Sequence, residues 1–187
     1  MIEIELLEIS GIVGALRALR LPYGKECRSK IDGGGNLISL TLDNNNKLVF
    51  HSNWFVDINE NDLNLLTRLV SAGDEHAKVM RGVIAYFEIN APRFWWVEMD
   101  TYRIGREQLS SESTMHIQGK GLTEKELVEM KSKLCEGTMQ KRVVMISYQT
   151  LRRIYRQRKN HRLPHWRMFC EFLKNELPLQ ELITAQS

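Results

Sequence analysis

The stretch from Ala91 to His116, APRFWWVEMDTYRIGREQLSSESTMH, decides the fold that the sequence predicts, because it leads from an apolar run into a helix and then into a hydroxyl-rich segment. Pro92 suits the first turn of a helix, where its missing N–H group costs nothing, and no further helix breaker occurs before Gly105. The pattern therefore predicts a helix from Phe94 to Tyr102. Its apolar face comprises Trp95, Met99 and Tyr102.

A polar loop is expected after Gly105. Hydroxyl and backbone N–H groups next to basic side chains can cradle a phosphate, which needs many short donors and positive charge. The alternative, which composition alone favours, is a core helix followed by a Ser-rich surface turn. The polar residues of this loop are Ser110, Ser111, Glu112, Ser113, Thr114 and His116.

Length and composition predict a soluble globular protein. The chain has 187 residues, of which 43% are hydrophobic and 26% are charged, so we expect one domain spanning residues 1–187. No apolar run approaches the ~20 residues that a membrane span requires. The N-terminal residues MIEIELLEIS are acidic where a signal peptide would be basic, and this predicts a cytoplasmic protein. The net charge of +3 is too small to separate nucleic acid from small anions as partners.

The three cysteines are odd in number and far apart in the sequence. That argues against a disulfide scaffold, and the spacing does not suit a metal site. We expect Cys27, Cys135 and Cys170 to be reduced and structural.

Before the central stretch, the chain predicts a sheet. Ile2, Ile4 and Leu6 alternate with glutamates, which is the pattern of a strand with one wet face. Turn residues at 32–36 and 43–46 separate short apolar runs at 37–42 and 48–50, so this region reads as a β-hairpin or meander. The glycine triplet at 33–35 lacks the lysine and the helix of a P-loop and is interpreted as a turn.

Further elements are predicted by periodicity and capping signals. Residues 83–89 (VIAYFEI) are β-branched and aromatic, as in a buried strand that leads into Pro92. Thr123 and Glu126 form a capping box for a helix whose apolar stripe comprises Leu127, Met130 and Leu134. The remaining expectations are a helix from Asp62 to Val70 ended by Gly73, a strand at 142–147, and helices at 150–158 and 164–173.

The last two helices carry a dense basic cluster. Its arginines and lysine lie around Tyr155 and Trp166, an arrangement that can bind phosphates and stack a base. A nucleotide site and an RNA or DNA groove are both compatible with it, and so is a solvated helix face that pairs with the acidic N-terminal strand. The basic residues are Arg152, Arg153, Arg156, Arg158, Lys159, Arg162 and Arg167.

The order of these parts resembles the flavin-dependent thymidylate synthase family, whose signature reads RHRxxSxNExSxRY. Aligning Ala91-Pro92 with the family places Thr101-Tyr102-Arg103 on its Arg-His-Arg, and residues 111–116 on Asn-Glu-x-Ser-x-Arg. Thr150-Leu151-Arg152 falls on the family's Asn-Leu-Arg. Three departures are Thr101 and Tyr102 in the first motif, Arg81-Gly82 in place of a Glu-His pair, and Glu98 in place of a glutamine.

The resemblance implies an α/β (α+β) fold with a central, mostly antiparallel sheet flanked by helices, and a homotetramer with sites shared between subunits. It implies reductive methylation of dUMP or a related pyrimidine nucleotide at C5, with FAD as cofactor and NADPH and methylenetetrahydrofolate as co-substrates. The implied roles are catalysis for Arg158 or Arg162, either of which can match a later arginine of the family, cofactor binding for Arg103, Glu112 and His116, and substrate binding for Glu98, Ser113, Thr114 and Arg152.

Two other hypotheses remain open. One is a diverged relative that binds a nucleotide without the family reaction, which the departures at Thr101, Tyr102 and Gly82 motivate. The other is a nucleic-acid-binding module that uses the C-terminal basic cluster. No serine is expected to act as a nucleophile, because no histidine is placed by the sequence to serve as its base.

Overall fold

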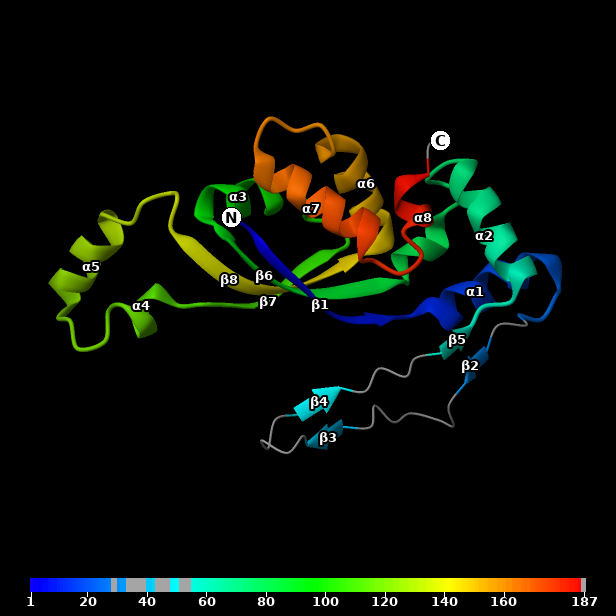
Figure 1. Ribbon diagram of the computed structural model, residues 1–187, viewed down its shortest axis with the longest axis horizontal. Helices are drawn as coiled ribbons and strands as arrows, with labels where there is room; N and C mark the ends of the chain where they lie inside the picture. Colours follow the sequence, from blue (N-terminus) through cyan, green and yellow to red (C-terminus); the bar gives the residue numbers. More distant parts are fainter. Residues whose placement is uncertain (28–29, 33–39, 43–47, 51–54, 186–187) are drawn as a thin grey trace.

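A four-stranded antiparallel sheet forms the centre of the computed structural model, which describes residues 1–27, 30–32, 40–42, 48–50 and 55–185 (Figure 1). The strand order is β1-β6-β8-β7, and each neighbouring pair is antiparallel. This confirms the α+β fold with an antiparallel sheet. The strands are β1 (Glu3–Ser10), β6 (Ile84–Pro92), β7 (Arg106–Ser111) and β8 (Met139–Ser147).

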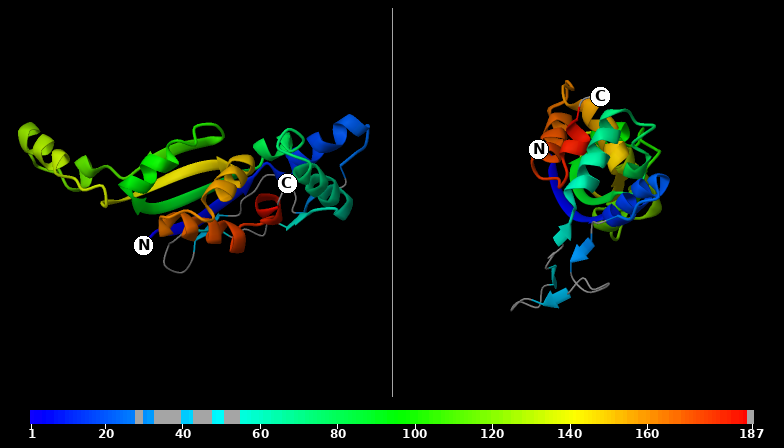
Figure 2. Two further views of the ribbon diagram at one scale, coloured as in Figure 1. Left: turned by 90° about the horizontal axis from the view of Figure 1, so that it is seen from above. Right: turned by 90° about the vertical axis from the view of Figure 1, so that its right-hand side faces the viewer.

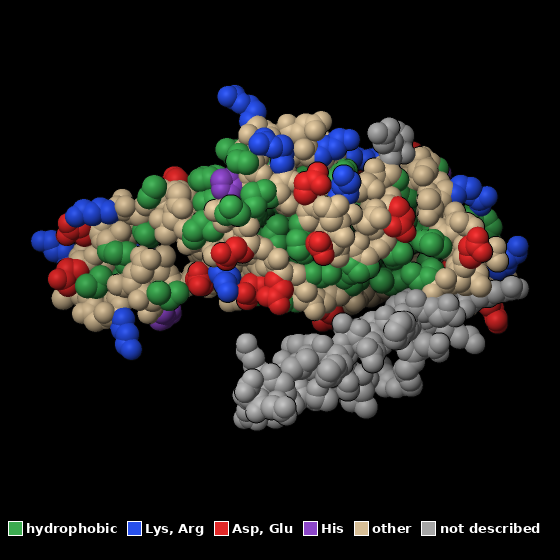
Figure 3. Space-filling model, viewed as in Figure 1, with side chains coloured by type: hydrophobic (Ala, Val, Ile, Leu, Met, Phe, Trp, Pro, Cys, Tyr) green, Lys and Arg blue, Asp and Glu red, His purple; other side chains and the backbone are tan. Residues whose placement is uncertain are grey.

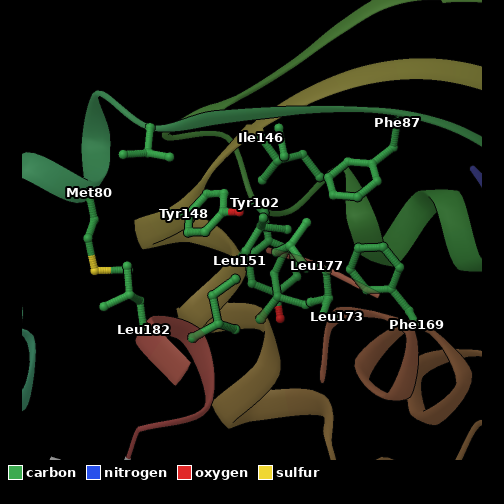
Figure 4. Packing of buried hydrophobic residues seen from close by; sticks show 14 of the residues in the cluster. Met80, Phe87, Tyr102, Ile146, Tyr148, Leu151, Phe169, Leu173, Leu177 and Leu182 are labelled. Carbon is green, nitrogen blue, oxygen red and sulfur yellow. The ribbon is translucent and has the colours of Figure 1, made fainter. Parts of the chain in front are cut away.

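Helices cover one face of this sheet, where the core lies (Figures 1 and 2). Along β6, Ala85, Phe87 and Ile89 are fully buried while their neighbours are half-buried, as the period of a strand requires. Phe87 meets Phe169 edge to face, with ring centroids 6.1 Å apart (Figure 4). The covering helices are α3 (Arg93–Met99), α6 (Tyr148–Arg158), α7 (Pro164–Asn175) and α8 (Glu181–Thr184).

The N-terminal helices lie beside one end of the sheet (Figure 1). The fully buried Asp62 accepts a hydrogen bond from Arg20 Nε at 2.6 Å and joins two of them, α1 and α2. The predicted helix at 62–70 is confirmed as part of α2. The elements here are α1 (Ile12–Arg20), α2 (Glu60–Ser71) and the short 3₁₀ helices η1 (Leu21–Tyr23) and η2 (Lys78–Arg81).

The predicted meander is confirmed for its strands. β3 (Leu40–Leu42) pairs antiparallel with β4 (Leu48–Phe50), and β2 (Lys30–Asp32) pairs with β5 (Phe55–Asp57). The glycine triplet at 33–35 and the turn at 43–46 lie outside the described residues.

A protruding arm, residues 112–138, connects β7 to its neighbouring strand β8 (Figures 1 and 2). It holds α4 (Thr114–Ile117) and α5 (Glu124–Ser132), and no residue of either helix is buried. The capping box of Thr123 and Glu126 is confirmed, although α5 ends at Ser132 and leaves Leu134 beyond it. Within the described part of the chain, no helix combines the length and the apolar character that crossing a membrane demands.

Two predicted boundaries around the central stretch are wrong. α3 ends at Met99, and Tyr102 follows in a tight turn whose backbone N–H donates to the Met99 carbonyl at 3.1 Å. Trp95, Met99 and Tyr102 are nevertheless all buried. The expected hydroxyl-rich loop starts later than predicted, since Ser110 and Ser111 belong to β7 and pair with β8. Pairing with a neighbouring strand overrides the weak strand preference of these serines.

Candidate functional site

The turn after α3 lies against the beginning of α6. The Gly105 carbonyl accepts a hydrogen bond from Ser147 N at 2.8 Å, and the Ile104 carbonyl accepts one from Thr150 Oγ1 at 2.8 Å. Ser147 is the N-cap of α6, and its hydroxyl accepts from Thr150 N. Gly105 has a φ of +74°, and a Cβ there would lie 2.5 Å from both hydroxyl oxygens, so this contact requires glycine.

A cavity of about 630 Å³ opens beside this junction. Its walls come from η2, β6, β7, β8 and α6, elements that are distant in sequence. Ile84, Ile104 and Met145 supply apolar surface. The polar and charged lining residues are Asp74, Arg81, Arg106, Glu107, Ser147, Gln149, Thr150 and Arg153.

Three arginines line the cavity. Arg81 donates from Nε to Gln149 Oε1 at 2.6 Å, and Arg106 donates from Nη2 to Asp100 Oδ1 at 2.8 Å. The guanidinium carbon of Arg153 lies 5.4 Å from the centre of the Tyr102 ring. The Arg106 side chain is only 7% exposed, and its buried Nε has no partner among the described residues. A buried donor without a partner favours an acceptor supplied from the cavity.

The acidic groups of the cavity do not cancel this charge. Asp74 pairs outside the cavity, with Arg156 Nη1 at 3.5 Å and Arg152 Nε at 4.0 Å. Glu107 is exposed and is the other acid in the lining. The first turn of α6 contributes Gln149 and Thr150, so the positive end of that helix also faces the cavity. The cavity therefore suits an anion.

The predicted residues Glu98 and Arg158 form a separate cluster. Arg158 Nη1 donates to Glu98 Oε2 at 2.7 Å, and Trp166 Nε1 donates to the same oxygen at 2.9 Å. Arg158 Nε also donates to the Tyr102 hydroxyl at 2.9 Å. In this arrangement the charges of Glu98 and Arg158 neutralise each other.

Arg152 is 1% exposed and ties α6 to the end of α2. Its Nη1 donates to the Val70 carbonyl at 2.7 Å, while Nε and Nη2 are buried without a hydrogen-bond partner among the described residues. Burial lowers the pKa of the Arg152 guanidinium, the neighbouring Arg156 lowers it further, and Asp74 opposes both effects.

Four other predicted residues lie on or beside the arm. Glu112 Oε2 accepts a hydrogen bond from Lys141 N at 3.0 Å, and Ser113 is the N-cap of the single turn formed by Thr114–Ile117. All four residues come after Ser111, the last residue of β7, whereas the cavity is lined by Arg106, the first residue of that strand. A strand of six residues spans roughly 20 Å, so one chain does not bring this group to the cavity. The group comprises Glu112, Ser113, Thr114 and His116.

None of the nine predicted site residues lines the cavity. Arg103 is exposed in the turn that leads to Ile104, and Arg162 is exposed in the connection between α6 and α7. The family resemblance assigned no role to the lining arginines, although Arg153 belongs to the predicted basic cluster and Arg106 follows Gly105. Their convergence depends on the sheet and has no local signal in the sequence.

The basic cluster of α6 and α7 is arranged differently from the base-stacking surface that the sequence suggested. Trp166 is fully buried and packs on Trp95, with ring centroids 4.7 Å apart, so it cannot stack a base. Three arginines of the cluster have acidic partners outside the N-terminal strand: Arg152 and Arg156 pair with Asp74, and Arg158 pairs with Glu98. Exposed Lys and Arg side chains still gather along the upper edge of the face in Figure 3.

A second cavity of about 850 Å³ lies between α1 and α2. Arg20, Lys25 and Arg68 line it together with Asn61 and Asn64. It is larger, but none of its described lining residues has a buried nitrogen without a partner. The cavity at Arg106 is therefore the better candidate for a ligand site.

No protein-family model matches the chain, and no curated protein matches it. Solved structures resemble it in fold. Thymidylate synthase X (ThyX) from Helicobacter pylori, crystallised with FAD and dUMP, superposes with a TM-score of 0.66 at 14% identity, covering 97% of this chain and 96% of that one. The UMP/dUMP methylase PolB from Streptomyces cacaoi, bound with 5-Br dUMP, gives a TM-score of 0.62 at 12% identity and covers 100% of this chain and 96% of that one. The chain thus has the fold of the flavin-dependent thymidylate synthases, as its motif order suggested.

Proposed function

We propose that this protein is a flavin-dependent enzyme that methylates dUMP or a related pyrimidine nucleotide. One observation carries the proposal: the two segments that resemble the family's motifs meet beside a cavity with excess positive charge, where Thr150 Oγ1 donates to the Ile104 carbonyl at 2.8 Å. The similar structures hold FAD and dUMP, or 5-Br dUMP, which makes a nucleotide the natural ligand. NADPH and methylenetetrahydrofolate complete the proposed reaction as co-substrates.

The residues present fit FAD. The unpartnered Nε of Arg106 supplies a buried donor for a phosphate oxygen, and Ile84 and Met145 offer apolar surface to a ribose or a ring. When bound, FAD would supply the hydride chemistry. The chain would bind and orient both nucleotides, and positioning of this kind accounts for much of the rate in reactions whose hard step belongs to a cofactor.

The proposed site is shared between subunits of a homotetramer. Glu112, Ser113, Thr114 and His116 lie about one strand length from the cavity of their own chain, so they would serve the cavity of a second copy. The arm that carries them leaves Ile117 63% exposed and Val128 62% exposed, and a second copy would cover such side chains.

The roles proposed for the other motif arginines follow from the family resemblance. Arg103 would reach the cofactor from the turn that leads into the cavity, and Arg162 is the predicted catalytic arginine that is still exposed. Arg158 would act on the substrate only after exchanging its ion pair with Glu98.

A second candidate function is nucleotide binding without the family reaction. Tyr102 favours it, because this residue replaces a motif histidine and is buried at 4% exposure, with its hydroxyl donating to Gln157 Oε1 at 2.8 Å. The position therefore contributes to the core and offers no polar group to a ligand.

The absorbance spectrum of the purified protein tests the proposal. We expect flavin bands between about 350 and 500 nm, retained on gel filtration after FAD is added, and oxidation of NADPH that depends on dUMP and methylenetetrahydrofolate. Flavin binding without NADPH oxidation for any pyrimidine nucleotide would support the second candidate. A protein that retains no FAD contradicts both the cofactor and the proposed reaction.

A further inference from the structure

The first motif of the family contributes two arginines and a histidine, but positions 101 and 102 of this chain are Thr101 and Tyr102. The motif thus lacks the positive charge of an arginine at position 101. The cavity instead has arginines that come from other elements. Arg81 is the last residue of η2, Arg106 begins β7, and Arg153 lies in the second turn of α6. Three guanidinium groups thus converge from segments that are more than twenty residues apart in the chain.

The charges of the lining set the class of ligand. Asp74 is already paired with Arg152 and Arg156, and Asp100 is shared between Arg106 and Arg142. Within the lining itself, Glu107 is the acid left to oppose three arginines. An excess of positive charge therefore remains, and the diphosphate of a dinucleotide is negatively charged. Guanidinium groups suit this partner because they bind phosphate oxygens through paired N–H donors.

The lining arginines are held in place by their own partners. Gln149 Oε1 accepts from Arg81 Nε, and Asp100 accepts from Arg106 Nη2, so each guanidinium is oriented by one hydrogen bond and keeps other N–H groups for a ligand. Arg153 lies over the ring of Tyr102, the residue that replaces the motif histidine. The buried Nε of Arg106 has no partner among the described residues, and it is the donor that a bound anion would satisfy.

We infer that Arg81, Arg106 and Arg153 form a composite site for the diphosphate of the dinucleotide cofactor, in place of the arginine and histidine that the motif lacks at positions 101 and 102. This inference rests on the proposed function for the identity of the cofactor. It assigns the three arginines a binding role and no part in bond making.

Titration of the purified apoprotein tests the site without any enzymatic assay. Calorimetry would compare ADP, inorganic pyrophosphate, FAD and dUMP on the wild type and on Arg81→Gln, Arg153→Gln and Arg106→Lys. Arg106→Lys keeps a cation beside Asp100, and its fold is checked by circular dichroism. Arg17→Gln on the exposed face of α1 is the matched control, because it removes one positive charge from a residue that does not line the cavity.

We expect ADP and FAD to bind the Arg81 and Arg153 variants about 10- to 100-fold more weakly than the wild type, as the loss of one charge-assisted hydrogen bond predicts. Arg17→Gln should bind as the wild type does. The inference is overturned if both variants bind ADP with wild-type affinity, or if dUMP loses as much affinity as ADP. Tight ADP binding that requires these arginines, together with no binding of FAD, would support the site and contradict the proposed function.

Discussion

Arg158 and Glu98 lie 2.7 Å apart, from Nη1 to Oε2, and this ion pair joins the last turn of α6 to α3. Glu98 also accepts from Trp166 Nε1, so one carboxylate serves a cation and an indole. We predict that Glu98→Ala lowers the free energy of unfolding by about 1–3 kcal/mol, since it leaves a half-buried guanidinium and a buried indole without an acceptor. Glu98→Gln should cost less, because an amide oxygen can still accept.

Urea denaturation measures both variants. The exposed pair of Glu129 and Lys133 gives a matched control, since an exposed pair one helical turn apart adds little to stability. If Glu98→Ala is no more destabilising than Glu129→Ala, the ion pair at Arg158 does not hold α6 to α3.

Substitution of Gly105 tests the contact between the α3–β7 turn and the start of α6. Gly105→Ala combines a left-handed φ with a Cβ 2.5 Å from the Ser147 and Thr150 hydroxyl oxygens. Gly121→Ala has a similar φ of +84° but no neighbour within 4 Å, so it isolates the backbone strain. We expect about 1 kcal/mol of destabilisation from Gly121→Ala and roughly 2–4 kcal/mol from Gly105→Ala in thermal unfolding. Equal effects would mean that the contact with α6 is not tight.

Arg152 has a structural role in the fold, through its hydrogen bond to the Val70 carbonyl. Arg152→Met fills the same space without a donor, and we expect it to lower the free energy of unfolding by about 1–3 kcal/mol. Arg152→Lys keeps a donor and should recover part of that loss. Calorimetry with dUMP on the folded variants separates this role from the substrate binding implied by the motif. A change in dUMP affinity at unchanged stability would assign Arg152 to the ligand instead.

The capping box of α5 predicts a dependence on pH. Hydrogen bonds from the Thr123 side chain and then from its backbone N–H lower the pKa of the Glu126 carboxyl below its ordinary value of 4.5. A group whose pKa is lower in the folded state stabilises the fold above its unfolded pKa, and this contribution is lost as the pH falls through the folded value. Amide hydrogen exchange in α5 should therefore accelerate below about pH 4.5, after correction for the intrinsic rate. In Glu126→Gln this pH dependence should disappear.

The cysteines should differ in reactivity. Burial raises the pKa of the Cys170 thiol to about 12, and Glu171 adds to the effect while Arg158 opposes it, so little thiolate exists at pH 8. Cys135 is exposed. We expect iodoacetamide at pH 8 to modify Cys135 in the native protein, and Cys170 only after denaturation. Mass spectrometry of tryptic peptides measures both, and modification of native Cys170 would contradict the packing of α7.

Periodicity and capping were enough to predict the main elements of the fold. The alternation at Ile2–Leu6, the apolar run at 83–89 and the capping box at Thr123 correspond to β1, β6 and α5. These signals are local, because a strand or a helix imposes its period on the residues that face the core. The burial of Trp95, Met99 and Tyr102 follows from the same reasoning, even though α3 ends before Tyr102.

The sequence by itself thus determined β1, β6, β8, the helices α3, α6 and α7, and the order of parts that resembles a flavin-dependent enzyme, whereas β7 lies where a loop was predicted. Only the tertiary structure decided where a ligand can bind. Arg81, Arg106 and Arg153 meet because β6, β7 and β8 pair in a particular register and α6 starts where β8 ends. The same packing buries Arg152 and pairs Arg158 with Glu98. The convergence of side chains from distant segments depends on long-range contacts, which leave no periodic pattern in the chain.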